Sequence, residues 1–365
     1  MNIILIILVF GVIIFFHELG HFIVAKINHI TVKEFSMGFG PKLFQFHKKE
    51  TQYTLRLIPL GGYCMMLSED DEENENDENS FEKKSIWARM AVVLAGPAMN
   101  FVIAFLFSMV IIHFCGSDPA IIGAVYNKDN IEKYQIENAE EYFNGVYPAE
   151  EAGISDGDQV LKIEGSTVKN FRELQFYLQI YGDGSPIDLT LEKEDGTVYD
   201  TTVHPAKTPD GYKIGIMSVG YQLPKNFGEL CKYSAYETRY WVKATFLSLK
   251  LIVTRQVSSD EVSGPVGVAK NMNDTFNEAA KSSVLDLFLN WMNYIVLLSA
   301  NLGVMNLLPI PGLDGGRFIF LLIEAVTRKK VPKDKENIVT LIGFVLVMLL
   351  MVVILFNDIK NVFFH

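Results

Sequence analysis

The sequence predicts an α-helical membrane protein with four transmembrane helices and an α+β domain inserted outside the membrane. Three observations favour this fold class. Hydrophobic residues make up 49% of the 365 residues, and the mean hydropathy of +0.20 is high for a soluble protein. Four stretches reach the roughly 20 mostly apolar residues that a membrane-spanning helix needs. A long polar segment with strand and turn signals separates the second stretch from the third.

The first apolar stretch is expected to remain in the protein as a helix. A cleaved signal peptide needs positive charge before its apolar core, and no Lys or Arg precedes Lys26. The other boundaries follow from hydropathy and turn signals. We expect the first helix in residues 1–27, a cytoplasmic-side region in 28–87, the second helix in 88–115, the inserted domain in 116–218, an amphipathic outer-surface segment in 219–283, the third helix with a proline- and glycine-rich stretch in 284–323, a cytoplasmic loop in 324–337 and the fourth helix in 338–357.

Basic residues in the short connecting segments predict the orientation of the helices. Residues 26–89 and residues 328–335 are rich in Lys and Arg, and short basic loops stay in the cytoplasm. We therefore expect both segments on the cytoplasmic side, with both termini and the inserted domain outside. Long translocated domains are exempt from this charge rule, so the basic residues of the inserted domain are no objection.

The motif HExxH lies inside the first apolar stretch. His17 and His21 are four residues apart, so on a helix they share one face and can bind one Zn²⁺, while Glu18 can hold a water without being a ligand. Gly20 lets another element approach closely. The alternative is a pair of core histidines that hydrogen bond across a helix bundle. Ionisable groups within a membrane are costly and by default indicate function, which favours the metal site.

Asp314 is the candidate for a third ligand, because catalytic zinc usually takes three protein ligands and a water. It lies in NLLPIPGLDGGR, where Pro309 and Pro311 break the third apolar stretch. Irregular backbone at membrane depth is tolerated where it is buried in protein or lines a wet cavity. The alternative is a helix cap, since a carboxylate binds free N–H groups at the start of a helix. Beside an incomplete zinc site, ligation is the favoured interpretation.

With these motifs the chain resembles the site-2 proteases, a family of intramembrane zinc metalloproteases. His17, Glu18 and His21 match the HExxH motif of the family, and Asp314 matches its LDG element. The stretches LAGPAMNF (residues 94–101) and SGPVGVA (residues 263–269) resemble two further family elements. The resemblance covers nearly the whole length and is strongest to the bacterial regulator of sigma E protease type.

The resemblance implies a Zn²⁺-dependent endopeptidase in a bacterial cytoplasmic membrane. The expected substrates are single-span membrane proteins that another protease has already trimmed, such as anti-sigma factors or signal-peptide remnants. Glu18 is then the general base that takes a proton from the attacking water. Two other classes stay open. One is a catalytically inactive scaffold that presents a peptide-binding domain. The other is a zinc transporter, which needs a polar path that the fourth apolar stretch does not offer.

The inserted domain resembles a single PDZ domain, where some relatives have two. Residues 147–165 resemble a PDZ core, and residues 186–205 alternate about Asp195 and Gly196 as a hairpin does. Such a domain can bind an extended peptide by strand addition, so its groove is a possible site for a substrate tail. The rival expectation is a size filter that excludes substrates with bulky outer domains.

Two features are predicted to bind the substrate. Residues 34–46 alternate in the manner of a strand, and Gly38 and Gly40 on either side of Phe39 let another backbone come close. The resemblance implies a membrane re-entrant β loop here, whose edge clamps an unwound substrate; the alternative is an ordinary interfacial hairpin. By resemblance, the amide of Asn306 holds the substrate backbone or the developing oxyanion, although intramembrane Asn also forms helix–helix hydrogen bonds.

Composition narrows the expected partners to lipid and membrane proteins. The net charge is −11, and eight acidic residues lie between Glu69 and Glu78 in a run that predicts a solvated loop. No basic patch with aromatic partners indicates nucleic-acid binding. The cysteines Cys64, Cys115 and Cys231 are widely scattered and indicate no disulfide framework.

Overall fold

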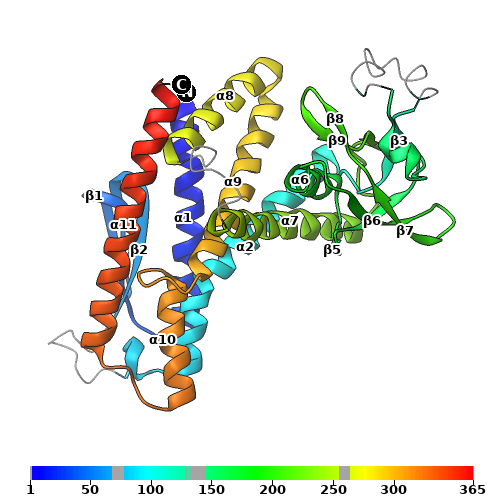
Figure 1. The fold of residues 1–365 in the computed structure, drawn as a ribbon. Helices are drawn as coiled ribbons and strands as arrows, with labels where there is room; N and C mark the ends of the chain where they lie inside the picture. Colours follow the sequence, from blue (N-terminus) through cyan, green and yellow to red (C-terminus); the bar gives the residue numbers. More distant parts are fainter. Residues whose placement is uncertain are drawn as a thin grey trace. The chain divides into compact units, whose positions relative to one another are not determined.

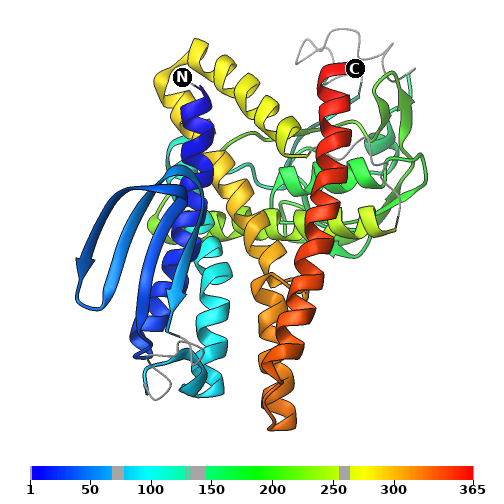
Figure 2. The ribbon, with the colours of Figure 1, turned by 90° about the vertical axis from the view of Figure 1, so that its left-hand side faces the viewer.

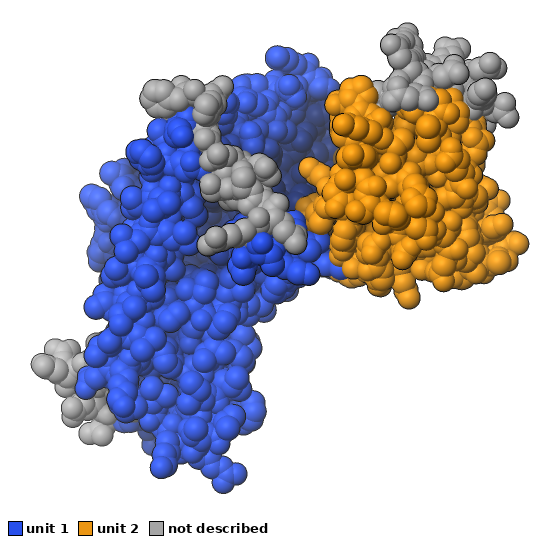
Figure 3. Space-filling model, viewed as in Figure 1, with its two compact units in different colours: residues 1–108, 241–365 blue, residues 109–240 orange. Residues whose placement is uncertain are grey.

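The computed structural model describes residues 2–67, 78–127, 130, 143, 145–254 and 264–364. These residues fall into two compact units, residues 1–108 with 241–365 and residues 109–240, which Figure 3 colours separately. The predicted acidic loop lies outside the described residues except for Glu78, as does Ser263 of the SGPVGVA stretch.

Among the described residues, four helices are long and apolar enough to cross a membrane, which confirms the four predicted spans by length and composition. They are α1 (Asn2–Ile27), α2 (Ile86–Cys115), α9 (Val284–Leu307) and a span from Asp334 to Lys360 within α11 (Lys333–Phe364), as Figure 1 shows. The chain is therefore a multi-pass membrane protein.

A buried apolar cluster joins α1, α2, α9 and α8 (Pro265–Ser282). Val9 and Ile13 of α1 pack with Ile295 of α9 and Phe276 of α8, and all four side chains are almost completely buried. A Cβ atom added to Gly20 would lie 2.3 Å from the backbone oxygen of Ala95 in α2. The expectation that Gly20 permits a close approach is thus confirmed.

The third span breaks at its prolines. α9 ends at Leu307, and the helix α10 begins at Asp314 and runs to Thr327. Between them the chain folds back over the first turn of α10, because Cβ atoms added to Gly315 and Gly316 would lie 2.2 Å and 2.4 Å from the backbone oxygens of Leu308 and Ile310. α10 is longer than expected, so only residues 328–332 separate it from α11, where we expected a loop over 324–337.

A two-stranded sheet lies along α1, formed by β1 (Val32–Lys48) and β2 (Thr51–Met66), as Figure 2 shows. Both strands bend, and each pairs twice. Residues 34–37 of β1 lie between two segments of β2 and pair with residues 62–65 on one side and residues 52–55 on the other. Residues 52–55 of β2 also pair with residues 44–47 of β1. The strand predicted over 34–46 is therefore present, within a more extensive pairing than the sequence indicated.

The second unit has the α+β composition expected of the inserted domain. A four-stranded sheet of order β5-β4-β6-β7 is accompanied by the helix α6 (Phe171–Ile180) and two small antiparallel pairs. The predicted hairpin about Asp195 and Gly196 is β6 with β7. The strands are β3 (Ile122–Val125), β4 (Gln159–Ile163), β5 (Ser166–Thr167), β6 (Ile187–Glu192), β7 (Val198–Val203), β8 (Ala206–Thr208), β9 (Gly211–Lys213) and β10 (Ile216–Ser218), with a short helix α5 (Pro148–Glu151) before β4.

The segment expected to be amphipathic, residues 219–283, contains two helices. α7 runs from Phe227 to Val253, and α8 follows it after residues that lie outside the described part of the chain. The start of α8 is capped by Asp358 of α11, whose carboxylate accepts hydrogen bonds from the backbone N–H groups of Val266 at 2.6 Å and Gly267 at 3.0 Å. The end of α11 is thereby tied to α8.

Candidate metal centre

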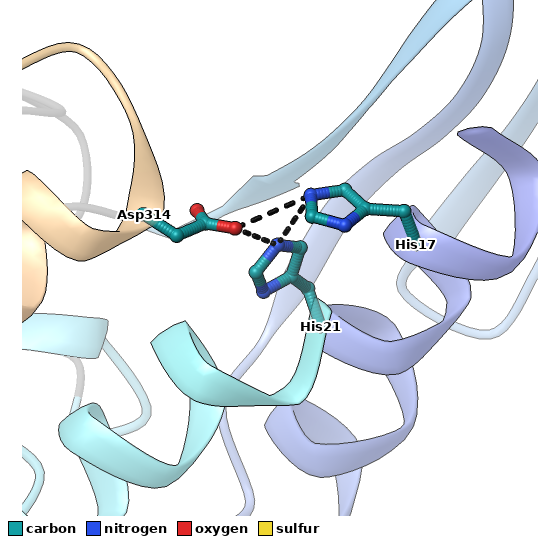
Figure 4. Close-up of side chains that lie close together, drawn as sticks. All are labelled: His17, His21 and Asp314. Carbon is teal, nitrogen blue, oxygen red and sulfur yellow. Dashed lines mark hydrogen bonds and ion pairs between the residues drawn. The ribbon is translucent and has the colours of Figure 1, made fainter. Parts of the chain in front are cut away.

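Three predicted ligands converge on one point between α1 and α10, as Figure 4 shows. Asp314 Oδ2 lies 3.2 Å from His17 Nε2 and 3.3 Å from His21 Nε2, and the two Nε2 atoms are 3.4 Å apart. Both histidines are buried and Asp314 is half-buried. Among the described residues this is the one group of three or more His, Cys, Asp or Glu side chains arranged to hold a metal ion.

The arrangement fits a zinc ion. Two zinc–ligand bonds of about 2.05 Å at a tetrahedral angle place their ligand atoms about 3.3 Å apart, which matches the three distances seen here. Asp314 Oδ2 is buried and has no hydrogen-bond donor of its own. A carboxylate oxygen and two imidazole nitrogens that face one another need a shared cation, and a divalent ion supplies it.

The other ring nitrogen of each histidine is held by α2, which orients the imidazole. His21 Nδ1 donates to the backbone oxygen of Val92 at 2.8 Å, and His17 Nδ1 lies 3.2 Å from the amide of Asn100. Asn100 Oδ1 is buried without a partner. A half-turn of that amide lets Oδ1 accept from His17 Nδ1–H, so both Nε2 atoms keep a lone pair for the metal.

Asn100 was not among the predicted site residues, although the stretch LAGPAMNF that contains it was noted. Its place next to His17 depends on how closely α2 approaches α1. That approach requires Gly96, because a Cβ atom there would lie 2.3 Å from His21 Nε2 and 2.7 Å from His17 Cε1. The signal that could have identified Asn100 is its position one helical turn after Gly96.

A cavity of about 330 Å³ opens beside the three ligands. Glu18 lines it together with His17, His21 and Asp314, as the HExxH spacing predicts. One wall is formed by the end of β2 and the residue after it, with Tyr63, Cys64, Met66 and Leu67 in the lining. This part of β2 passes close to Glu18, because a Cβ atom on Gly62 would lie 3.3 Å from Glu18 Cγ.

The predicted substrate-binding residues divide into two groups. Asn306 lies at the metal centre, with its amide nitrogen 3.4 Å from His17 Nε2. Gly38, Phe39 and Gly40 are not among the described residues that line the cavity. They lie where β1 bends: Gly38 has a φ of +88°, and the ring of Phe39 covers Gly61 and is half-exposed. The part of β2 that follows Gly62 lines the cavity, because it packs against α1.

Comparison with known proteins places this chain in a family. The model of peptidase family M50 matches residues 5–350. The chain belongs to peptidase family M50. A Clostridium acetobutylicum protein named as a candidate zinc metalloprotease is 38% identical, over 98% of this chain and 97% of the relative. The zinc metalloprotease RasP of Geobacillus kaustophilus is 32% identical, over 99% and 98% of the two chains.

The Bacillus subtilis regulator of sigma-W protease RasP is 29% identical, over 98% of each chain. These findings confirm that this M50 protein is a zinc metalloprotease of the site-2 type and that zinc is its metal. The predicted ligands and the predicted base of the M50 chain meet in one cavity.

Proposed function

We propose that this M50 protein is an intramembrane endopeptidase in which His17, His21 and Asp314 hold zinc and Glu18 is the general base. The observation that carries the proposal is the convergence of two Nε2 atoms and one carboxylate oxygen within 3.4 Å of one another, with Glu18 in the same cavity. The scaffold alternative predicts an incomplete site, and the presence of three side chains that could hold one metal ion supports the enzyme instead.

The chemistry divides between the metal and the side chains. When bound, zinc supplies electrostatic stabilisation of the carbonyl oxygen and lowers the pKa of a nearby water. Glu18 takes the proton of the attacking water and delivers it to the leaving amine. We propose that the amide of Asn306 donates a hydrogen bond to the oxygen on which negative charge develops, which its distance of 3.4 Å from His17 Nε2 supports.

A transmembrane substrate must unwind before its backbone can reach these groups, because a helix shields its own peptide bonds. The end of β2, from Tyr63 to Met66, lies beside the cavity and offers an extended backbone for strand addition. We propose that it holds the unwound substrate. Gly38, Phe39 and Gly40 then have an indirect role, in shaping the bend that places this part of β2.

The substrates we propose are single-span membrane proteins that another protease has trimmed outside, such as anti-sigma factors or signal-peptide remnants. The name of the Bacillus subtilis relative, a regulator of sigma-W protease, supports this class. Basic residues near Arg328 support an orientation in a bacterial cytoplasmic membrane with the termini outside. Residues 116–218 would then be an extracytoplasmic PDZ domain that screens substrates by size or binds their tails.

A cleavage assay with a model single-span substrate in detergent tests the proposal. The wild-type chain is expected to cut the substrate, and a zinc chelator should abolish cleavage. Glu18→Gln is expected to bind zinc as the wild type does and to lower kcat at least about 100-fold, because it cannot accept the water's proton. Cleavage at the wild-type rate by Glu18→Gln would remove the proposed base.

A further inference from the structure

Arg317 lies one helical turn beyond Asp314 on α10 and lines the same cavity as the metal ligands. Its guanidinium carbon is 5.8 Å from the centre of the Phe81 ring. Phe81 is fixed in place, because its N–H donates to the oxygen of Leu67 at 3.0 Å and its ring packs against the apolar cluster around Met90 and Leu321. The arginine therefore rests on a rigid aromatic surface.

A cation–π contact at this distance uses none of the guanidinium N–H groups as hydrogen-bond donors, so these groups can still donate to a ligand. No carboxylate pairs with Arg317 among the residues that the structure describes. Arg89 on α2 is the contrasting case, since Glu324 accepts two hydrogen bonds from it at 3.1 Å and 2.5 Å. Arg317 thus lines the cavity, and no described residue accepts a hydrogen bond from its guanidinium group.

Apart from Arg317, the side chains that line the cavity and can carry a charge at neutral pH are carboxylates or the two metal-binding histidines. Glu18, Glu82 and Asp314 all carry carboxylates, and Arg317 is the lone guanidinium or ammonium group beside them. Zinc is expected to receive the carbonyl oxygen of the cleaved bond, but an acidic substrate side chain beside that bond would meet the carboxylates unless a second cation receives it. Arg317 can do so with two parallel hydrogen bonds to a carboxylate.

We propose that Arg317 determines substrate specificity by binding a carboxylate or amide side chain of the substrate close to the cleaved bond and repelling a basic one. This inference rests on the proposed function. Residues three apart on a helix have Cβ atoms about 5–6 Å apart, and an extended chain advances about 3.3 Å per residue. The substrate residue that meets Arg317 therefore lies within about two positions of the cleaved bond.

The test uses the full chain and a set of single-span substrates that carry Glu, Gln or Lys at each position next to the cleaved bond. At one such position the wild type is expected to favour Glu over Lys. Arg317→Gln should lower the ratio of the two kcat/KM values about tenfold, mainly through KM, and Arg317→Glu should invert the preference. Arg317→Lys should retain it, because the charge is kept.

Arg328→Gln is the matched control, because Arg328 lies at the other end of α10 outside the cavity lining, and it should leave the preference unchanged. Zinc content is expected to be the same in all variants. An identical ratio in the wild type and both charge-changing variants would overturn the inference. The inference would also be overturned if Arg317→Gln lowered kcat/KM equally for all substrates and the size of that loss depended on the anionic lipid content of the detergent–lipid mixture. Arg317 would then bind a headgroup phosphate. Failure of the wild type to cut even the Gln substrates would instead count against the proposed function.

Discussion

Asp314 is the single carboxylate among the three described groups that converge at the metal centre, and it supplies the negative charge that two neutral imidazoles lack. Replacing it with Asn keeps the size and one oxygen but removes that charge. We expect Asp314→Asn to weaken zinc binding by more than about 100-fold, which exceeds the loss of affinity usual when a residue that only hydrogen bonds to a ligand is changed. Metal analysis after dialysis against a graded chelator measures this. Unchanged zinc affinity would exclude Asp314 as a ligand.

Asn100 does not bind the metal itself but holds the ring of His17, which is a proposed ligand. Its loss leaves His17 free to rotate, so we expect Asn100→Ala to lower zinc affinity by about 10- to 100-fold. The same dialysis measures the effect. Asn290→Ala is the matched control: Asn290 also lies on a membrane-spanning helix, but its side chain bonds to the backbone oxygen of Asp286 in its own helix. Equal losses for the two variants would contradict the role given to Asn100.

At the scale of secondary-structure elements, α8 and α11 depend on each other through Asp358. Its carboxylate is 4% exposed and accepts from the backbone N–H groups of Gly264, Val266 and Gly267. Because Asp358→Ala leaves these buried donors without partners, we expect it to lower the free energy of unfolding by about 2 kcal/mol. Thermal unfolding in detergent measures the change.

The control for that measurement is Asp274→Ala, which removes an exposed carboxylate from the surface of the same helix α8. We expect a change within about 0.5 kcal/mol. Asp358→Asn keeps one oxygen acceptor, and its stability should fall between that of the wild type and Asp358→Ala. A melting temperature for Asp358→Ala equal to that of the wild type would show that this cap contributes nothing.

For the whole molecule, the sequence predicted best the features that depend on neighbouring residues. The four spans follow from runs of apolar residues, and His17 and His21 meet because a helix places residues four apart on one face. Asp314 could be predicted because prolines and glycines around it break an apolar stretch. Each of these signals is contained within a short segment of chain.

The features that the sequence did not show depend on segments far apart in the chain. Asn100 reaches His17 only because Gly96 allows α2 to approach α1. The sequence indicated Gly38 and Gly40 as points of close backbone approach, whereas the described residues that line the cavity include Tyr63, Cys64, Met66 and Leu67, which the pairing of the two strands brings beside α1. Alternation of apolar and polar side chains identifies a strand. It does not show how many neighbouring segments that strand pairs with, or which of its edges faces a cavity.

The separation of the metal ligands along the chain has a consequence for biosynthesis. His17 and His21 emerge from the ribosome almost at once, whereas Asp314 follows only after most of the polypeptide has been made. A nascent chain that ends before Asp314 therefore holds two of the three proposed ligands, and we expect it to have no hydrolytic capacity while the earlier helices enter the bilayer. On this proposal the peptidase becomes competent only once α10 has been made.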